Sequence, residues 1–499
     1  EHLLQELLLP GSKGCGCLPP PLARGAASIV AARHAPATLL GCGLPDVTSG
    51  GGSGSRKKPQ SVAPLWPSAS PSSQKRDDGE ALERWGFKDT RFVADWVDGK
   101  PAVQITSRRY PGLGAQPLFQ LWSFFQTQLG VPMSVRDMLP ERPPPELPPL
   151  PDGLEEALAA ALPPGRARTD PESRLRAGTG HGLADIWKLR TRQLPRLPDA
   201  VVRPENEDEV QALLAAAAKF GFAVIPVGGR TNVTSATAVP PKEVDPRPFV
   251  MLDMRGMAKI VWVNAEDGVA MIEAGITGMA LKEGLSKFGV NMGMEPDSME
   301  FSTLGGWIAT RASGMKRARY GNIEDMVLEV RVVTPTGMLW QRHGDSSSAS
   351  GAATAIGRAS TNLGLPGLVL GSEGCLGVVT SAVVRITSLP EVVEYQSVVF
   401  PDWACGASWM REVARLPAAL RPASCRLMDQ NQLRLSRALR EGGGNHGSSL
   451  SAALQSAYLR FKGVRLDEAA AATLVFEGSR AEVRIQKEEL SKLVSRAGG

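Results

Sequence analysis

The pattern of apolar and polar positions is clearest over residues 201–228, where it predicts a strand, a helix and a second strand. Asn206, followed three residues later by Glu209, has the spacing of a capping box at a helix start. Apolar residues then recur at the i, i+3, i+4, i+7 spacing of one buried helix face, at Val210, Leu213, Leu214 and Ala217. Gly221 stands where a helix often ends, and residues 222–227 form an apolar, strand-like run.

Further along the chain, short strands alternate with helical spacing. Strand-like runs occur at residues 250–253, 260–263 and 269–273. Thr277 can cap a helix that extends to Phe288, with Leu281 and Leu285 on its apolar side. No GxGxxG motif follows a strand, so a dinucleotide-binding Rossmann site is not expected. The mixture favours an α+β fold.

Two changes of composition mark off N-terminal parts of the 499-residue chain. Residues 1–80 are rich in Gly, Pro, Ala and Ser and poor in aromatic residues, which predicts a disordered extension. A transit-type leader is the alternative, because residues 7–45 contain basic but no acidic side chains. Residues 81–173 form an aromatic-containing segment with a proline-rich linker, in which residues 153–162 predict a short helix.

Charge and cysteine content exclude several classes of protein. The chain has 56 Lys and Arg against 51 Asp and Glu, a net charge of +5, which is too weak and dispersed to indicate nucleic-acid binding. No apolar run reaches the roughly 18 residues that a membrane-spanning helix needs. The six cysteines form no CxxC pair and the five histidines do not cluster near them, so we expect no metal site and a reducing compartment.

Three glycine-containing stretches carry candidate chemistry. Residues 226–232 follow a predicted strand, where a glycine turn lets backbone N–H groups approach an anion; a plain β-turn is the alternative. Residues 293–325 are dense in glycines, hydroxyls and the cations Arg311, Lys316, Arg317 and Arg319. This composition is typical of a long anionic cofactor held against the backbone; a solvated basic loop is the alternative. Residues 371–380 lead into a strand and are also consistent with an ordinary hairpin entry.

The order of these motifs resembles that of the FAD-linked oxidases of the vanillyl-alcohol oxidase type. The resemblance is carried by residues 226–232, 295–303, 305–316, 320–325 and 371–380. The middle motifs are closer still to the alkyldihydroxyacetonephosphate synthases, the enzymes of ether-lipid synthesis. Residues 85–87, 109–111, 421–429 and 473–478 are also similar to that family, so the resemblance runs from about residue 82 to the end.

The resemblance implies a fold and a reaction. The fold would be α+β, with a two-subdomain FAD-binding domain over residues 174–387 and a partial substrate (cap) domain over residues 388–499. The reaction would exchange the acyl chain of acyl-dihydroxyacetone phosphate for a long-chain fatty alcohol, which makes the enzyme an alkylglycerone-phosphate synthase-type transferase. FAD would serve as a covalent handle for the substrate, with no net redox change.

The resemblance also implies a set of site residues and no metal. The residues expected to cradle the FAD pyrophosphate are Pro226, Val227, Gly228, Gly229, Arg230, Thr231 and Asn232. The residues expected to line the rest of the cofactor are Asp297, Ser298, Met299, Glu300, Phe301, Ser302, Thr303, Thr310, Arg311, Ala312, Ser313, Glu373, Gly374, Cys375, Leu376, Gly377, Val378 and Val379. Arg426 matches an arginine that the family needs for activity and is the expected catalytic residue; a structural ion pair is the alternative.

Arg230 departs from the family, which has a glycine at this position. If the position requires a positive φ, arginine costs roughly 1 kcal/mol there. Its Cβ would then crowd the pyrophosphate, or its guanidinium would instead reach the phosphates. The sequence leaves both alternatives open.

The resemblance sets further expectations for the whole protein. The chain ends midway through the cap region of the family, before its catalytic tyrosine, phosphate-binding arginine and multi-histidine stretch, so residues 1–499 alone are expected to lack synthase activity. A peroxisomal location, peripheral membrane association and a homodimer are also expected. The alternatives are an FAD-dependent oxidoreductase of a 2-hydroxy acid or alcohol, and an inactive truncated or flavin-free protein.

Overall fold

The structure is a computed structural model that describes residues 79–106, 117–130, 146–194, 196–340, 364–440, 464–465 and 467–499. All of these residues belong to one compact unit, Trp66–Gly499. The predicted extension up to residue 78, most of the proline-rich linker and residues 109–111 lie outside the described residues, as do Cys15, Cys17 and Cys42.

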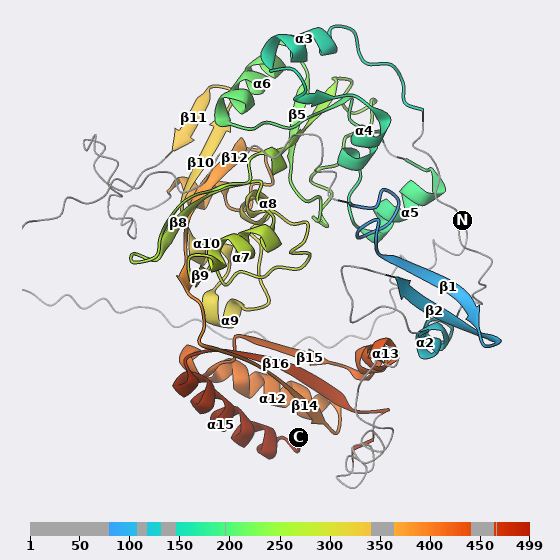
Figure 1. Ribbon diagram of the computed structural model, residues 1–499, viewed down its shortest axis with the longest axis vertical. Coiled ribbons are helices and arrows are strands. Elements are labelled where there is room, and N and C mark those ends of the chain that lie inside the picture. The colour runs from blue at the N-terminus through green and yellow to red at the C-terminus, as the bar shows by residue number, and fades with distance from the viewer. Residues whose placement is uncertain are drawn as a thin grey trace, which may run out of the picture. The chain divides into compact units, whose positions relative to one another are not determined.

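A four-stranded sheet contains the predicted strand–helix–strand unit (Figure 1). Its strand order is β3-β4-β6-β5, in which β4, β6 and β5 are parallel and β3 is antiparallel to β4. The strands are β3 (Ala167–Arg168), β4 (Ala200–Val202), β5 (Ala223–Val227) and β6 (Phe249–Asp253). Helix α6 (Glu207–Phe220) connects β4 to β5. As predicted, Asn206 accepts the Glu209 N–H at 2.9 Å, and Gly221 ends the helix with a φ of 77°.

A five-stranded antiparallel sheet follows in the order β11-β10-β12-β8-β7. Its strands are β7 (Ile260–Asn264), β8 (Val269–Glu273), β10 (Val327–Thr334), β11 (Gly337–Trp340) and β12 (Val378–Arg385). Thr277 caps helix α7 (Gly278–Ser286) and Leu285 is fully buried, as predicted. The predicted extension to Phe288 is wrong: Phe288 is 48% exposed, and Gly289, with a φ of 72°, turns the chain into β9 (Val290–Asn291).

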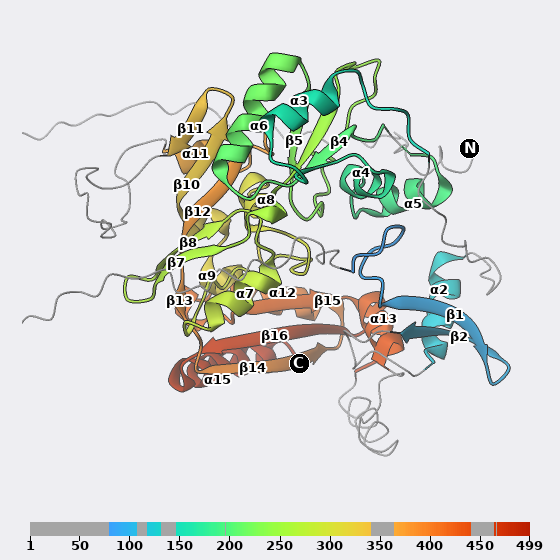
Figure 2. The ribbon, with the colours of Figure 1, turned by 45° about the horizontal axis from the view of Figure 1, so that its top comes forward.

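Helix α6 packs the two sheets into one domain. Its Leu213 and Leu214 share a core with Val250 of β6 and with Val333 and Val378 of the five-stranded sheet. Helix α3 (Leu154–Ala161), the short helix predicted in the linker, lies beside α6 in both ribbon views (Figures 1 and 2). A second core fills the space between the five-stranded sheet, α7 and helix α8 (Leu304–Ala309).

The C-terminal region is a three-stranded antiparallel sheet in the order β14-β16-β15 (Figure 2). The strands are β14 (Val392–Phe400), β15 (Ser424–Met428) and β16 (Ala470–Gly478). Helices α12 (Trp403–Arg415) and α15 (Arg480–Arg496) cover one face, where Phe400, Trp409 and Phe476 are buried. Because side chains alternate along a strand, Glu477 belongs to the opposite face.

The remaining elements precede or connect these sheets. They are β1 (Arg91–Val97), β2 (Lys100–Thr106), α2 (Phe119–Leu129), α4 (Pro171–Gly178), α5 (Leu183–Thr191), η3 (Met254–Gly256), α9 (Arg317–Tyr320), α10 (Ile323–Met326), α11 (Leu365–Val369), β13 (Thr387–Ser388), η4 (Ala418–Leu420) and α13 (Gln430–Arg440). The N-terminal hairpin and α2 share a core with α13 through Trp122 and Ala438. The α+β class predicted from the sequence is confirmed. None of the helices in the described ranges is long and apolar enough to cross a membrane.

Candidate cofactor site

A cavity of about 350 Å³ lies at the carboxyl end of strand β5. Its wall combines the glycine turn with parts of the two later stretches that were predicted to bind the cofactor. The predicted residues that line it are Pro226, Val227, Gly228, Gly229, Arg230, Thr231, Asn232, Asp297, Ser302, Thr303, Thr310, Ala312, Glu373, Gly374, Gly377 and Val379. Three stretches that are far apart in the sequence therefore meet around one cavity.

The two glycines of the turn allow it to lie directly against residues 301–303. A Cβ on Gly228 would come within 2.1 Å of the Thr303 hydroxyl, and a Cβ on Gly229 within 2.0 Å of the Phe301 carbonyl oxygen. Real Cβ atoms do not approach so closely, so a larger residue at Gly229 requires a shift of the backbone and one at Gly228 a shift of the Thr303 side chain. Thr303 is itself fixed, because its buried side chain accepts the Gly306 N–H at the start of α8.

Several residues that line the cavity have hydrogen-bond donors that could bind an anionic cofactor. Within the described part of the chain, the backbone N–H groups of Gly228, Gly229 and Thr231 donate to no protein acceptor. Trp307 also lines the cavity, and its indole Nε1 is buried without a hydrogen-bond partner among the described residues. Buried donors without acceptors are costly, and consecutive N–H groups at the end of a strand form a concave anion site. The residues present therefore fit the pyrophosphate of a dinucleotide such as FAD.

The other predicted cofactor residues do not line this cavity. They are Ser298, Met299, Glu300, Phe301, Arg311, Ser313, Cys375, Leu376 and Val378. Val378 is in the core beside α6, Leu376 is 54% exposed, and the Ser313 hydroxyl donates to Asn322 at 2.8 Å. Phe301 is buried, and its ring stacks on Phe87 with a centroid distance of 4.8 Å.

Three of the four cations of the 293–325 stretch, Arg311, Lys316 and Arg319, have carboxylate neighbours among the described residues. Lys316 Nζ lies 2.8 Å from Glu295 and 2.6 Å from Glu477. Burial alone would lower the Lys316 pKa, but its hydrogen bonds to these two carboxylates raise the pKa above its ordinary value. Arg311 lies 3.7 Å from Glu324 of the same stretch, and Arg319 lies 3.7 Å from Glu482 of α15. The solvated basic loop of the sequence analysis is therefore in part a set of ion pairs that join segments of the chain.

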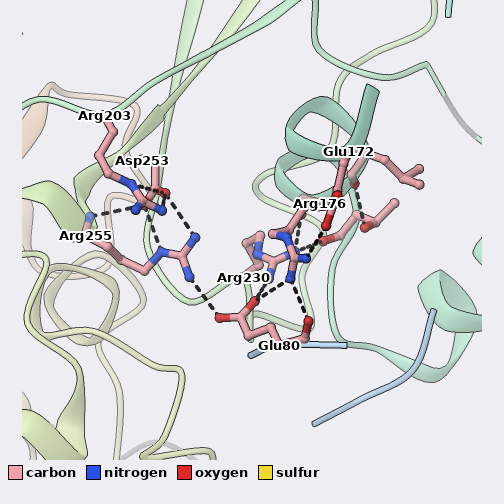
Figure 3. A network of polar contacts seen from close by, with 9 residues as sticks. Glu80, Glu172, Arg176, Arg203, Arg230, Asp253 and Arg255 are labelled. Carbon is pink, nitrogen blue, oxygen red and sulfur yellow. Dashed lines mark hydrogen bonds and ion pairs between the residues drawn. The ribbon is translucent and has the colours of Figure 1, made fainter. Parts of the chain in front are cut away.

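Arg230 has the positive φ that the sequence analysis considered, 59°. Its backbone lines the cavity, whereas its guanidinium is buried in a second cluster of charged residues (Figure 3). Arg230 Nη2 lies 2.5 Å from Glu80, and Nη1 donates to the backbone oxygens of Arg176 and Thr179. The guanidinium is thus engaged by Glu80 and two backbone oxygens, so it is not free to bind a phosphate in this arrangement.

Arg426, the predicted catalytic residue, lies on β15 opposite Thr473 of β16. It is exposed, and its guanidinium contacts the Met315 sulfur at 3.3 Å. Among the described residues Arg426 has no ion pair, so the structure gives no support to the structural-pair alternative. Arg426 does not line the cavity, and its catalytic role stays a prediction.

The sequence analysis missed two groups of residues near the cavity. The turn continues into Val233, Thr234, Ala236 and Thr237, which also line it. Asn232 holds this continuation, because its side chain accepts the Ala236 N–H at 3.1 Å. The run of Thr, Asn and Ser over residues 231–237 was the available signal. His181 was also missed; its backbone N–H donates to the Arg230 oxygen and its ring lies 4.9 Å from Phe301.

Comparisons with known proteins agree with this architecture. Residues 198–341 match the family model of the FAD binding domain, and residues 389–499 match that of the FAD linked oxidases, C-terminal domain. An alkyldihydroxyacetonephosphate synthase of Caenorhabditis elegans is 35% identical over 426 residues, which are 83% of this chain and 66% of that protein. The chain thus spans slightly less than two thirds of that relative.

A solved structure of an alkyldihydroxyacetonephosphate synthase superposes with a TM-score of 0.71 and 29% identity over 84% of this chain and 74% of that chain. A mitochondrial D-lactate dehydrogenase of Arabidopsis thaliana is 28% identical over only 48% of this chain and 38% of its own length. The cofactor of the matched domain is FAD, whose pyrophosphate fits the glycine turn. The chain belongs to the alkyldihydroxyacetonephosphate synthase family of FAD-linked flavoproteins.

Proposed function

We propose that the protein is a transferase of ether-lipid biosynthesis that exchanges the acyl chain of acyl-dihydroxyacetone phosphate for a long-chain fatty alcohol. The products are alkyl-dihydroxyacetone phosphate and a fatty acid. The observation that carries the proposal is the similarity to alkyldihydroxyacetonephosphate synthases, which extends through both the FAD-binding and the C-terminal regions. The D-lactate dehydrogenase, in contrast, matches less than half of the chain.

In this proposal the residues of the chain bind and orient FAD and the substrate. FAD supplies a covalent handle for the substrate when it is bound, without net redox change. The N–H groups of Gly228, Gly229 and Thr231 hold the pyrophosphate, and the Trp307 indole donates a further hydrogen bond to the cofactor. Arg426, exposed on β15, holds the anionic substrate through charge-assisted hydrogen bonds.

The proposal also covers membrane association, cellular location and oligomeric state. The substrates carry long alkyl chains, so we expect peripheral association with a membrane, and we expect the protein in the peroxisome as a homodimer. Exposed aromatic side chains on β1, Phe92 at 56% and Trp96 at 61%, support a lipid contact. Flotation with phosphatidylcholine vesicles, subcellular fractionation and sedimentation velocity test these three expectations separately.

The reaction is tested by an exchange assay on the purified protein loaded with FAD. Acyl-dihydroxyacetone phosphate is incubated with labelled hexadecanol, and labelled alkyl-dihydroxyacetone phosphate is measured. Labelled product supports the proposal, and no product from flavin-loaded protein would contradict it. Flavin reduction by D-lactate or glycolate without exchange would replace it with the oxidoreductase alternative.

A variant of Arg426 tests whether this residue binds the substrate in the proposed reaction. Arg426→Lys keeps a positive charge but loses the planar fork that binds a carboxylate or phosphate with two hydrogen bonds. We expect exchange to fall by at least about 10-fold while FAD affinity is unchanged. Unchanged exchange would remove Arg426 from the proposed site.

A further inference from the structure

A buried carboxylate from the N-terminal segment lies behind the pyrophosphate turn. Glu80 is 5% exposed, and its two oxygens lie 2.5 Å from Arg230 and 2.9 Å from Arg255 (Figure 3). Arg176 lies 3.7 Å from the same carboxylate. Glu80 is thus the acidic centre among three guanidinium groups, one of which belongs to the turn.

The segment that carries Glu80 is folded tightly on itself. The Ala81 N–H donates to the Gly86 oxygen at 2.9 Å, and residues 80 and 87 form an antiparallel bridge. This arrangement presents the Glu80 carboxylate and the Phe87 ring together. The carboxylate contacts Arg230, and the ring stacks on Phe301.

Arg230 and Phe301 lie on the two sides of one close contact between the turn and residues 301–303. Arg230 follows Gly229, and Gly229 lies directly against the Phe301 carbonyl. Residues 79–90 therefore hold both the turn and the segment against which the turn packs. Trp85 adds an edge-on contact to Phe301 at 5.6 Å.

We propose that Glu80 is a positioning residue for FAD: by holding the Arg230 guanidinium, it keeps the N–H groups of residues 228–231 directed into the cofactor cavity. The proposal requires FAD binding but not the transferase reaction, so it stands or falls separately from the proposed function. Glu80 does not line the cofactor cavity and acts on the cofactor through Arg230.

The consequence of losing the Glu80 charge follows from electrostatics. Three guanidinium groups would remain close together without their shared counter-ion, and Arg230 is the most deeply buried of them. A buried cation without its partner is strongly disfavoured. Arg230 would move toward water, and because its φ is positive and two glycines precede it, the turn would move with it.

The experiment is a titration of FAD into the apo form of the 499-residue chain, followed by quenching of flavin fluorescence. Glu80→Gln should weaken FAD binding by about 10-fold or more. Glu83→Gln is the matched control: Glu83 is also buried and in the same segment, and it lies 2.6 Å from Arg192, which follows helix α5 and is not part of the turn. The control should lower stability without changing FAD affinity.

Arg230→Gly completes the test, because glycine accepts the positive φ and removes the group that Glu80 holds. We expect this variant to bind FAD within about 3-fold of the parent chain, and Glu80→Gln to have little further effect in its background. If Glu80→Gln alone does not fold, the FAD affinities of Arg230→Gly and of the double variant Glu80→Gln/Arg230→Gly still test the proposal. Equal losses of FAD affinity with Glu80→Gln in both backgrounds, or with Glu80→Gln and Glu83→Gln alike, would overturn the proposal.

Discussion

At the scale of the residue, His181 has the most unusual environment beside the pyrophosphate turn. Neither ring nitrogen has a hydrogen-bond partner among the residues that the structure describes. Burial, and after it the positive charge of Arg230, lowers the His181 pKa from 6.5 to about 4, although Glu80 acts in the opposite direction. The folded chain therefore holds a neutral imidazole at neutral pH.

This environment predicts that the chain loses stability in mild acid. Between pH 6.5 and 4 the unfolded chain binds a proton at His181 that the folded chain does not bind, so the free energy of unfolding decreases as pH falls. The decrease amounts to about 3 kcal/mol and ends below about pH 4. His181→Phe keeps a ring against Phe301 and binds no proton, so it should remove this part of the slope. Urea unfolding of the parent chain and of His181→Phe across this pH range measures the difference. An equal pH dependence of the free energy of unfolding in the two proteins would show that His181 is not its source.

Arg230 illustrates how much a single residue reveals from sequence. Its place in a glycine turn was enough to suggest a positive φ, and the structure has that φ at 59°. The direction of its side chain was not accessible, because the partner, Glu80, is 150 residues away in the sequence. Local conformational preference is a property of the chain nearby, whereas a buried ion pair depends on which segments the fold brings together.

At the scale of the element, the strand–helix–strand unit was predictable because its signals are local. A capping residue, a helical apolar spacing and a terminal glycine lie within about one helix length. The cavity was predictable only in part. All seven residues of the turn at 226–232 line the cavity. Residues 298–301 do not line it, because Met299 packs on α7 and Phe301 on the N-terminal segment.

The contact between the turn and residue 301 gives the prediction at this scale. Gly229→Ala places a Cβ 2.0 Å from the Phe301 carbonyl oxygen, so the turn must move and its N–H groups lose their direction. We expect FAD affinity to fall by at least about 10-fold and the free energy of unfolding by about 2 kcal/mol. Fluorescence titration and urea unfolding measure the two effects.

Gly221→Ala separates close packing from backbone strain. Gly221 has a φ of 77° and open space around its missing Cβ. This variant should cost about 1 kcal/mol of stability through strain alone and leave FAD affinity unchanged. A comparable loss of FAD affinity in both variants would mean that general destabilisation, not the position of the turn, governs cofactor binding.

At the scale of the whole molecule, ion pairs connect the FAD-binding region to the C-terminal sheet. Glu477 of β16 is 3% exposed; it accepts the Tyr320 O–H at 2.8 Å and lies 2.6 Å from Lys316. The basic composition of residues 311–319 is visible in the sequence and predicts phosphate contacts. Its pairing was not visible, because Glu477 is separated from Tyr320 by 157 positions and is brought close only by the arrangement of the two regions.

Glu477→Gln should weaken this connection and thereby loosen the C-terminal region. Lys316 would retain Glu295 but lose its second carboxylate in a buried contact, which we expect to cost about 3 kcal/mol. Hydrogen exchange should then rise across residues 389–499 more than in the FAD-binding region. Glu394→Gln is the control, since Glu394 pairs with Lys487 at 2.6 Å on the same sheet but at a largely exposed site, where the loss should be about 0.5 kcal/mol. If the two variants increase exchange equally, the C-terminal region is held by its own packing, and the Glu477 contacts do not couple it to the cofactor domain.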